Sequence, residues 1–426
     1  MNYLIKEIKL NNGARGLIID YPGARTVYNE IAFNAGYWQI NDFEHKQQIP
    51  HIYEHMATNV RGYGSKAAFD LAVTKNGTIR NASTSNEFVR FFTMSAKFDY
   101  ERVLGLQCQM LGGTDLNDKT FIAEKKNIAN ELSARLNSPI YTLIHAVKSS
   151  FGIHDMTPDG ALVALDNINL SDIIDYRNDC ITSSNMKFII AGDFRGDYSK
   201  IIGSYEHIDI PIGEPKLFPE WTLHDSGAFT IQRSDTKQST ARLSFAMPRV
   251  FTTKDGAAMA IIHRLLVVGM GSRVFGKARA KGLVYSLSQD TESTAGYTIM
   301  SFNFAYKDEN LDALLKLIAS ELCNLRDGGL SDGELEAAKC SIAGAELMSY
   351  ETPRSVAKAL FRRYLRLGEI RDLDGFADVV RSITADDVAG LVDELIRSGR
   401  IALGLYGNVT DDRAKAARDM VLDRLV

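Results

Sequence analysis

The sequence has no apolar run of the roughly 20 residues that a membrane-spanning helix needs. The strongest candidate, residues 261–268, is short and contains His263 and Arg264. An excess of one charge is also missing, because 49 Lys and Arg stand against 53 Asp and Glu, for a net charge of −4. A nucleic-acid-binding protein would usually show a basic face. We therefore expect a globular protein with neither a membrane span nor nucleic acid as a partner.

Cysteine is rare as well. The chain has four cysteines, far apart in sequence and without any C-x-x-C pair: Cys108, Cys180, Cys323 and Cys340. We expect reduced, mostly buried thiols and no cysteine-based metal site. The first residues show no basic segment followed by an apolar one, which is the pattern of a secretory signal. These absences together predict a cytoplasmic protein.

Proline is scarce, and its distribution suggests a domain boundary. Three of the nine prolines, Pro211, Pro215 and Pro219, lie close together near the midpoint. A helix cannot continue through such a segment. We therefore predict a linker at 209–224 between a domain at 1–208 and a second domain at 225–426.

The two halves resemble each other at an offset of 215 positions. A buried strand followed by a Gly-containing turn occurs at 186–197 and again at 401–412. Helical segments that begin near Leu170 and near Thr384 precede these strands, and Glu131 corresponds to Glu346. Three matches at one offset predict a duplicated domain. Thr384 and Asp387 also have the spacing of a helix-capping pair.

Strands and helices mix within each half. Residues 87–94, 241–246 and 297–302 have the composition of strands, whereas residues 311–318 have apolar positions at helical spacing. Because the two types do not alternate strictly, we predict an α+β fold in which each domain has a mostly antiparallel sheet packed by helices.

The segment His51-Ile52-Tyr53-Glu54-His55 carries the chemistry. On a helix, His51 and His55 lie on one face, where two imidazoles can occupy two corners of a tetrahedral Zn²⁺ site. Glu54 lies beside them and can accept a proton from a water on the metal. This is the H-x-x-E-H arrangement of inverted zincins, and Pro50 before it suits the first turn of a helix. The competing interpretation is a pair of solvent-facing histidines on an amphipathic helix.

A catalytic zinc needs a third protein ligand and an open position for water. Glu124 and Glu131 are seven residues apart, on one face of a predicted helix. Either could be the ligand, with the other supporting the site from behind. A solvated charged face is the alternative interpretation of this segment.

With these residues in place, the chain resembles the pitrilysin–insulysin–mitochondrial processing peptidase family of zinc metallopeptidases. In that family a glutamate about 76 residues after the motif completes the zinc site, which corresponds to Glu131 when counted from His55. Glu124 corresponds to the family's accessory glutamate. Residues 10–15, 81–87 and 184–193 resemble the family's opening strand, its N-A-x-T-S-x-E edge strand and its domain-closing segment, so the resemblance covers essentially the whole chain.

In the second half, residues 271–275 and 279–285 resemble the family's S-R-L-F and R-E-K-G-L-x-Y segments. The resemblance implies that Arg279 and Tyr285 hold the substrate backbone near the scissile bond. The spacing between them is one residue shorter than in many relatives, and a core-packing aromatic is the alternative for Tyr285. Asn81 and Ala82 lie on the predicted edge strand, where an extended peptide could add by backbone hydrogen bonds. Residues 37–50 and 58–63, which flank the motif, differ from the family's usual sequences and leave substrate preference open.

The resemblance implies a zinc-dependent endopeptidase in which His51, His55 and Glu131 bind Zn²⁺, Glu54 is the base, and Glu124 orients a ligand. A non-catalytic family member that serves as a partner or scaffold subunit is one alternative, and a metal-binding protein without hydrolysis is another. The 215-residue offset places Leu266 and Met270 at the histidine positions, so we expect no metal site in the second half.

Family enzymes enclose peptides in a clamshell chamber of four homologous domains, and this chain would supply two of them, or half of the chamber. A homodimer is therefore expected. A heterodimer with a zinc-less homologue is the competing assembly.

Overall fold

The computed structural model describes residues 3–232, 238–294 and 296–425. The chain forms two compact units. Unit 1 comprises Met1–Ala134, Pro158–Pro219 and Ser349–Arg371, and unit 2 comprises Arg135–Thr157, Glu220–Met348 and Asp372–Val426. Each unit therefore contains a segment from the other half of the sequence.

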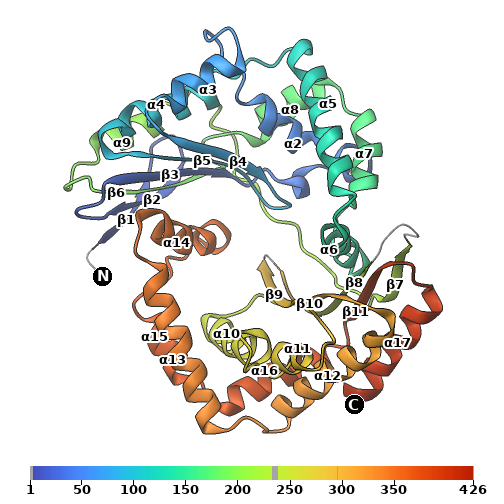
Figure 1. Ribbon diagram of the computed structural model, residues 1–426. Helices are drawn as coiled ribbons and strands as arrows, with labels where there is room; N and C mark the ends of the chain where they lie inside the picture. The colour runs from blue at the N-terminus through green and yellow to red at the C-terminus, as the bar shows by residue number, and fades with distance from the viewer. Residues whose placement is uncertain (1–2, 233–237, 295, 426) are drawn as a thin grey trace. The chain divides into compact units, whose positions relative to one another are not determined.

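Unit 1 is built on a six-stranded sheet with the order β1-β2-β6-β3-β5-β4 (Figure 1). All neighbouring pairs are antiparallel except β2 and β6, which are parallel. The strands are β1 (Leu4–Lys9), β2 (Arg15–Asp20), β3 (Thr26–Phe33), β4 (Ile79–Thr84), β5 (Val89–Ala96) and β6 (Met186–Gly192). In this order β4 is an edge strand.

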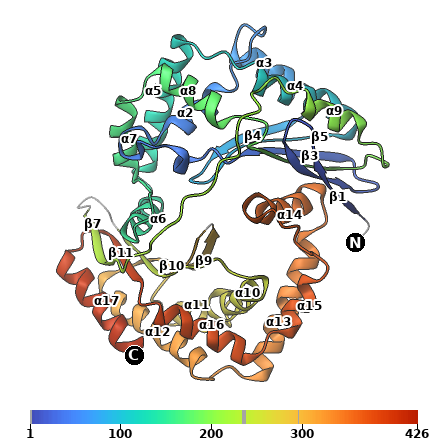
Figure 2. The same cartoon turned by 180° about the vertical axis from the view of Figure 1, so that it is seen from behind.

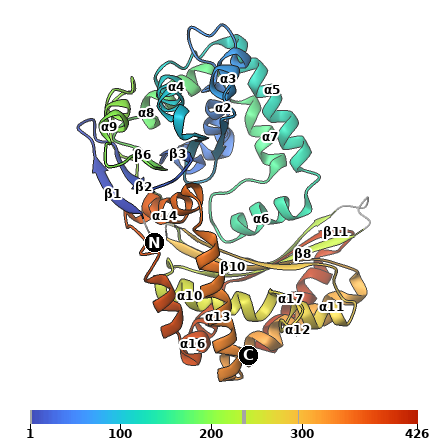
Figure 3. The same ribbon diagram turned by 60° about the vertical axis from the view of Figure 1, so that its left-hand side comes forward.

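The helices of unit 1 cover both faces of that sheet. Helices α2, α3 and α4 contact β4 and β5 on one face, whereas α14 packs against β2, β3 and β6 on the opposite face (Figure 3). The helical segments are η1 (Tyr37–Gln39), α1 (Phe43–Lys46), α2 (Ile49–Met56), α3 (Lys66–Thr74), η2 (Lys97–Asp99), α4 (Tyr100–Gly112), α5 (Asp118–Arg135), α7 (Pro158–Asp166), α8 (Leu170–Cys180), α9 (Ser199–Glu206) and α14 (Pro353–Leu367). Burial on both faces explains why Phe188, Ile189, Ile190 and Ala191 form an unbroken apolar run in β6.

Unit 2 has a five-stranded sheet with the order β7-β11-β8-β10-β9, in which only β7 and β11 are parallel (Figure 2). Helix α6 contacts β8 and β11, and α10, α16 and α17 also pack against strands of this sheet. The strands are β7 (Gly227–Gln232), β8 (Ser239–Met247), β9 (Leu287–Thr294), β10 (Tyr297–Tyr306) and β11 (Ile401–Gly407). The helices are α6 (Pro139–Ser150), α10 (Thr253–Val267), α11 (Phe275–Ala280), α12 (Asp308–Arg326), α13 (Asp332–Ser349), α15 (Phe376–Ser382), α16 (Ala385–Arg397) and α17 (Asp411–Leu425).

The duplication is visible in the topology. The order β2-β6-β3-β5-β4 in unit 1 matches β7-β11-β8-β10-β9 in unit 2. Strand β11 begins 215 residues after β6 and has the same length. The same offset relates two capping boxes, Asn169 with Asp172 at α8 and Thr384 with Asp387 at α16. Equivalent sequence patterns have therefore produced equivalent units.

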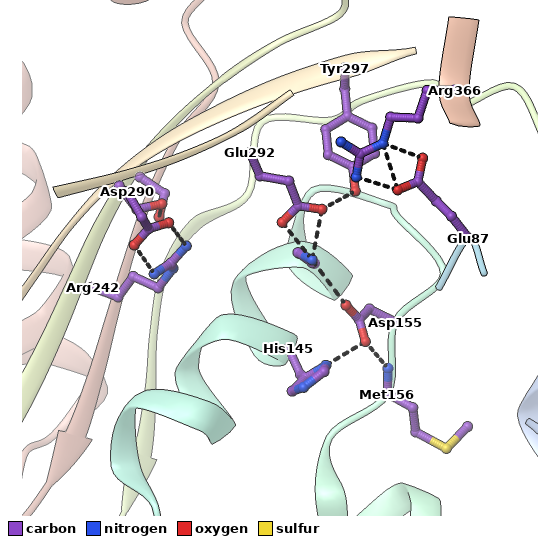
Figure 4. Close-up of polar contacts among 12 residues, drawn as sticks. Glu87, His145, Asp155, Met156, Arg242, Asp290, Glu292, Tyr297 and Arg366 are labelled. Atoms are coloured by element: carbon purple, nitrogen blue, oxygen red, sulfur yellow. Dashed lines mark hydrogen bonds and ion pairs between the residues drawn. The ribbon is translucent and has the colours of Figure 1, made fainter. Parts of the chain in front are cut away.

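The two units exchange equivalent helices, which the repeat in the sequence did not predict. Helix α6 lies in the first half of the chain but belongs to unit 2, and α14 lies in the second half but belongs to unit 1. An ion pair between side chains ties each of these two helices to its unit (Figure 4). Arg366 of α14 bonds Glu87 at 2.5–2.9 Å in unit 1, and Lys148 of α6 bonds Glu292 of β9 at 2.7 Å in unit 2.

The predicted α+β class with two mostly antiparallel sheets is confirmed. The predicted strands at 87–94, 241–246 and 297–302 correspond to β5, β8 and β10, and the predicted helix at 311–318 lies within α12. Residues 10–15 are not an opening strand, because they form the turn between β1 and β2 and only Arg15 is in a strand. The domain limits 1–208 and 225–426 stay a prediction. The change between units at Pro219 and Glu220 falls inside the predicted linker.

The four cysteines are free thiols, but the expectation that most are buried is wrong. Only Cys180 is buried, whereas Cys108 and Cys323 are half-buried and Cys340 is exposed. No helix among the described residues combines the length and the apolar character needed to cross a bilayer.

Candidate active site

Helix α2 carries the H-x-x-E-H segment and is held in place by its buried apolar residues. Pro50 stands in its first turn, and Ile52, Tyr53 and Met56 are buried. The helix packs against α8, β4 and β5. The rings of His51 and His55 lie edge to face, with centroids 4.8 Å apart. The two imidazoles therefore share one side of the helix, as their spacing predicted.

Both histidines point a ring nitrogen at Glu131 of α5. The Nε2 atoms of His51 and His55 lie 3.6 and 3.7 Å from Glu131 Oε2. One ligand atom from each of the three residues lies within 4.8 Å of the others. Zinc–ligand bonds of about 2.0–2.1 Å at tetrahedral angles would separate two ligand atoms by roughly 3.4 Å. The geometry and the donor set of two imidazoles and a carboxylate therefore fit Zn²⁺.

The other ring nitrogen of each histidine is held by an oxygen. His51 Nδ1 donates to Gln48 Oε1 at 3.0 Å, and His55 Nδ1 donates to Glu124 Oε2 at 3.0 Å. Because these oxygens can only accept, each ring carries its hydrogen on Nδ1 and leaves the Nε2 lone pair facing Glu131. Such outer partners fix the tautomer and the ring orientation that a metal needs.

Glu124 is buried and fully engaged. Besides His55, it accepts hydrogen bonds from Lys66 Nζ at 2.8 Å and Asn127 Nδ2 at 3.1 Å. Burial alone would raise the pKa of Glu124, but the hydrogen bonds from His55, Lys66 and Asn127 outweigh it and lower the pKa to about 2. The group is therefore a carboxylate over the working pH range and supports His55 from behind.

Glu54 lies on the same helix but has a different partner. Its Oε2 accepts a hydrogen bond from Thr84 Oγ1 of β4 at 2.7 Å. This contact holds the Glu54 carboxylate at the end of the edge strand. Glu131, with 36% of its side chain exposed against 6% for His51, marks the solvent-facing side of the cluster.

The edge strand β4 carries Asn81 and Ala82. Asn81 is exposed, and its Oδ1 accepts a hydrogen bond from the backbone N–H of Ala82 at 2.9 Å. Strand β4 pairs with β5 on one side and ends the sheet on the other. A peptide that joined this edge would have to take over the N–H of Ala82 from the Asn81 side chain.

Arg279 and Tyr285 lie in unit 2, at the end of α11 and in the bend before β9. Arg279 donates to the Tyr285 carbonyl at 2.8 Å, and its guanidinium stands 4.5 Å from the ring centroid of Tyr285. Tyr285 is 79% exposed. The alternative of a core-packing strand aromatic is therefore wrong, although the role of this pair stays a prediction.

The sequence analysis assigned five residues to one site, and in the structure these residues lie together on α2 and α5: His51, Glu54, His55, Glu124 and Glu131. It missed Gln48, Lys66 and Thr84. Thr84 stood in the edge-strand motif and could have been noticed, and Gln48 has the three-residue spacing to His51 of a helix neighbour. Lys66 gave no local signal.

The profile of a family described as "Peptidase M16 inactive domain" matches residues 167–341. These residues begin after the helices that carry the histidines, Glu54 and Glu131. The zinc protease PqqE of Helicobacter pylori is 23% identical over 93% of this chain and 91% of its own length. The beta subunit of the mitochondrial-processing peptidase of Lentinula edodes is 22% identical over 94% of this chain and 89% of its length. Among solved structures, a protease from H. pylori has a TM-score of 0.84 at 19% identity and covers 95% of this chain and 99% of its own.

Proposed function

This chain belongs to the pitrilysin family of M16 peptidases, and from that membership and the geometry of the site we propose that it is a zinc-dependent endopeptidase. The observation that carries the proposal is the convergence of two Nε2 atoms and one carboxylate oxygen, with both Nδ1 atoms already committed to acceptors. The alternative of two solvent-facing histidines does not account for the buried Gln48 and Glu124 side chains that hold the Nδ1 atoms.

His51, His55 and Glu131 would hold the metal. A Zn²⁺ ion bound there supplies Lewis acidity, which lowers the pKa of a water toward about 7 and polarises the scissile carbonyl. Gln48 and Glu124 keep the two imidazoles in the tautomer that can bind, and Lys66 balances the charge of Glu124.

Glu54 is the proposed base. It accepts a proton from the attacking water as the new C–O bond forms, and it gives this proton to the amine as the C–N bond breaks. The hydroxyl of Thr84 holds the carboxylate at 2.7 Å, so that Glu54 stands beside the edge strand instead of swinging into solvent.

The substrate would be an extended peptide or an unfolded polypeptide segment. Backbone hydrogen bonds to the open edge of β4, near Asn81 and Ala82, would bind it with little dependence on side chains. Following the family resemblance, Arg279 and Tyr285 would hold the substrate backbone near the scissile bond.

We propose a homodimer as the assembly, with Tyr285 of one chain serving the zinc site of the other. The closed two-fold symmetry of such a dimer gives two equivalent composite sites. A heterodimer with a zinc-less homologue is the competing arrangement. The cytoplasmic location drawn from the sequence stays a prediction.

Zinc content and cleavage of a quenched peptide library test the function together. Glu54→Gln should keep its zinc and lose about 10²- to 10⁴-fold in kcat/KM, because the base is not a ligand. His51→Ala should lose both metal and activity. As a control, His45→Ala should change neither, because His45 is exposed and its Nδ1 bonds Asp42.

Two results would contradict the proposal. Folded wild-type protein that binds zinc but cleaves no peptide would favour a scaffold subunit. Folded Glu54→Gln protein without metal would show that the roles are misassigned.

A further inference from the structure

Helix α14 is unusually basic for a helix that packs on a sheet. Its fifteen residues, Pro353–Leu367, contain five cations and no acid: Arg354, Lys358, Arg362, Arg363 and Arg366. Near its C-terminal end, Arg363 pairs with Glu369 and Arg366 pairs with Glu87. The two cations in the first two turns, Arg354 and Lys358, are directed toward the sheet instead.

Arg354 and Lys358 both stand over Phe92 of β5. The Arg354 Cζ and Lys358 Nζ atoms lie 5.7 and 5.8 Å from the centre of the Phe92 ring. Helix α14 itself contacts β2, β3 and β6, whereas Phe92 belongs to β5, so these two side chains extend toward the β5–β4 side of the sheet. Among the described residues, no carboxylate forms an ion pair with either cation.

A third cation lies on the same face. Arg90 of β5 has 39% of its side chain exposed, and its NH1 lies 3.6 Å from Glu30 Oε1. Its buried Nε has no hydrogen-bond partner. Glu30 is itself buried and accepts a hydrogen bond from Tyr28 at 2.5 Å. Around Phe92, among the described residues, Glu30 is the one carboxylate that forms an ion pair with any of these three cations, so this patch keeps a positive charge with unused donors.

The register of the sheet places this face next to the edge strand. Asn81 pairs with Phe92, and Ser83 pairs with Arg90. Paired residues on neighbouring strands point to the same face. Ala82 and Thr84 point to the other face, where Thr84 holds Glu54. A peptide added to β4 would alternate in the same way, so its residues opposite Asn81 and Ser83 would point toward Phe92 and the cations.

We propose that this face is a specificity subsite for acidic side chains, and that the enzyme prefers peptides with Asp or Glu opposite Asn81. That position is three residues from the one opposite Thr84, beside the base. The ring of Phe92 receives the methylene groups of the acidic side chain, and Arg354, Lys358 and Arg90 receive its carboxylate. This inference rests on the proposed function, since it uses β4 as the binding edge.

Peptide binding to the zinc-loaded Glu54→Gln protein tests the subsite without catalysis. Fluorescence anisotropy would compare peptides that differ only in Glu, Gln or Lys at each position in turn. We expect Glu to bind roughly tenfold more tightly than Lys at one position, as a charge-assisted contact implies. The preference should shrink as salt is raised, because exposed charges are screened.

Charge reversal supplies the matched comparison. Adding Arg354→Glu and Lys358→Glu should abolish or invert the preference, and the neutral pair Arg354→Gln and Lys358→Gln should reduce it without adding repulsion. Arg363→Glu makes the same change on the same helix but away from Phe92, and it should leave the preference intact.

The outcomes separate the subsite from the proposed function. Equal binding of Glu and Lys peptides at every position, no binding of any peptide, or an equal effect of Arg363→Glu would overturn the subsite. A clear preference that Arg354→Glu and Lys358→Glu remove, in a wild-type protein that cleaves nothing, would support the subsite and refute the peptidase.

Discussion

Gln48 offers the sharpest test of how the metal centre is built. It is 2% exposed, accepts from His51 Nδ1 at 3.0 Å and donates to Gln47 Oε1 at 2.6 Å. Gln48→Leu keeps the approximate volume but removes the acceptor. The His51 ring is then free to turn or to carry its hydrogen on Nε2, the atom that faces Glu131.

The expected loss follows from that change. Removing the outer partner of a metal-binding histidine typically costs 10- to 100-fold in metal affinity, which is about 1.4–2.7 kcal/mol. The free energy of unfolding should also fall by about 1–3 kcal/mol, because Gln47 Oε1 loses its donor in a buried place. Competition with a zinc chelator gives the first quantity, and urea unfolding of the metal-free protein gives the second.

Two variants isolate the role of the hydrogen bond. Gln47 is as buried as Gln48. Gln47→Leu should cost similar stability without weakening zinc, since among the described residues Gln48 and not Gln47 forms the hydrogen bond to His51. Gln48→Glu restores an acceptor and should bind zinc within several-fold of wild type. Normal zinc binding by Gln48→Leu, or an equal loss of zinc affinity in Gln47→Leu, would refute this role of Gln48.

Three further predictions concern stoichiometry, assembly and acid stability. The folded protein should bind one zinc per chain, since only one three-ligand cluster occurs among the described residues; a ratio near two by elemental analysis would contradict this. If the homodimer shares its sites, mixing inactive Glu54→Gln and Tyr285→Phe chains with confirmed subunit exchange should restore about a quarter of wild-type activity, because half of randomly mixed dimers hold one intact site. No recovery would exclude a shared site. Hydrogen bonds from Arg273 lower the pKa of Glu334 to about 2 from 4.5, so this pair stabilises the fold above pH 4.5 and the contribution is lost as the pH falls toward 2. In urea unfolding, the gap between wild type and Glu334→Gln should close over that range, and a gap that does not depend on pH would show that the pair does not act through ionisation.

The sequence by itself determined the features that depend on local periodicity. His51 and His55 face one way because four residues make about one helical turn. The turn-and-strand pattern near Gly192 recurs near Gly407, because equal patterns of burial and capping form equal elements. The sequence could also place Glu124 and Glu131 on one helical face, but the residues alone could not say which one faced the histidines.

Only the tertiary structure decided the contacts between distant segments. Glu124 accepts hydrogen bonds from His55 Nδ1 and Lys66, whereas Glu131 faces the Nε2 atoms of the two histidines. This difference depends on how α5 lies against α2. Helices α6 and α14 each pack on a sheet whose strands come from the other half of the chain. Arg354 meets Phe92 across 262 residues of sequence for the same reason. No local pattern encodes such pairs, because side-chain partners are fixed by the packing of whole elements and not by the propensity of any one of them.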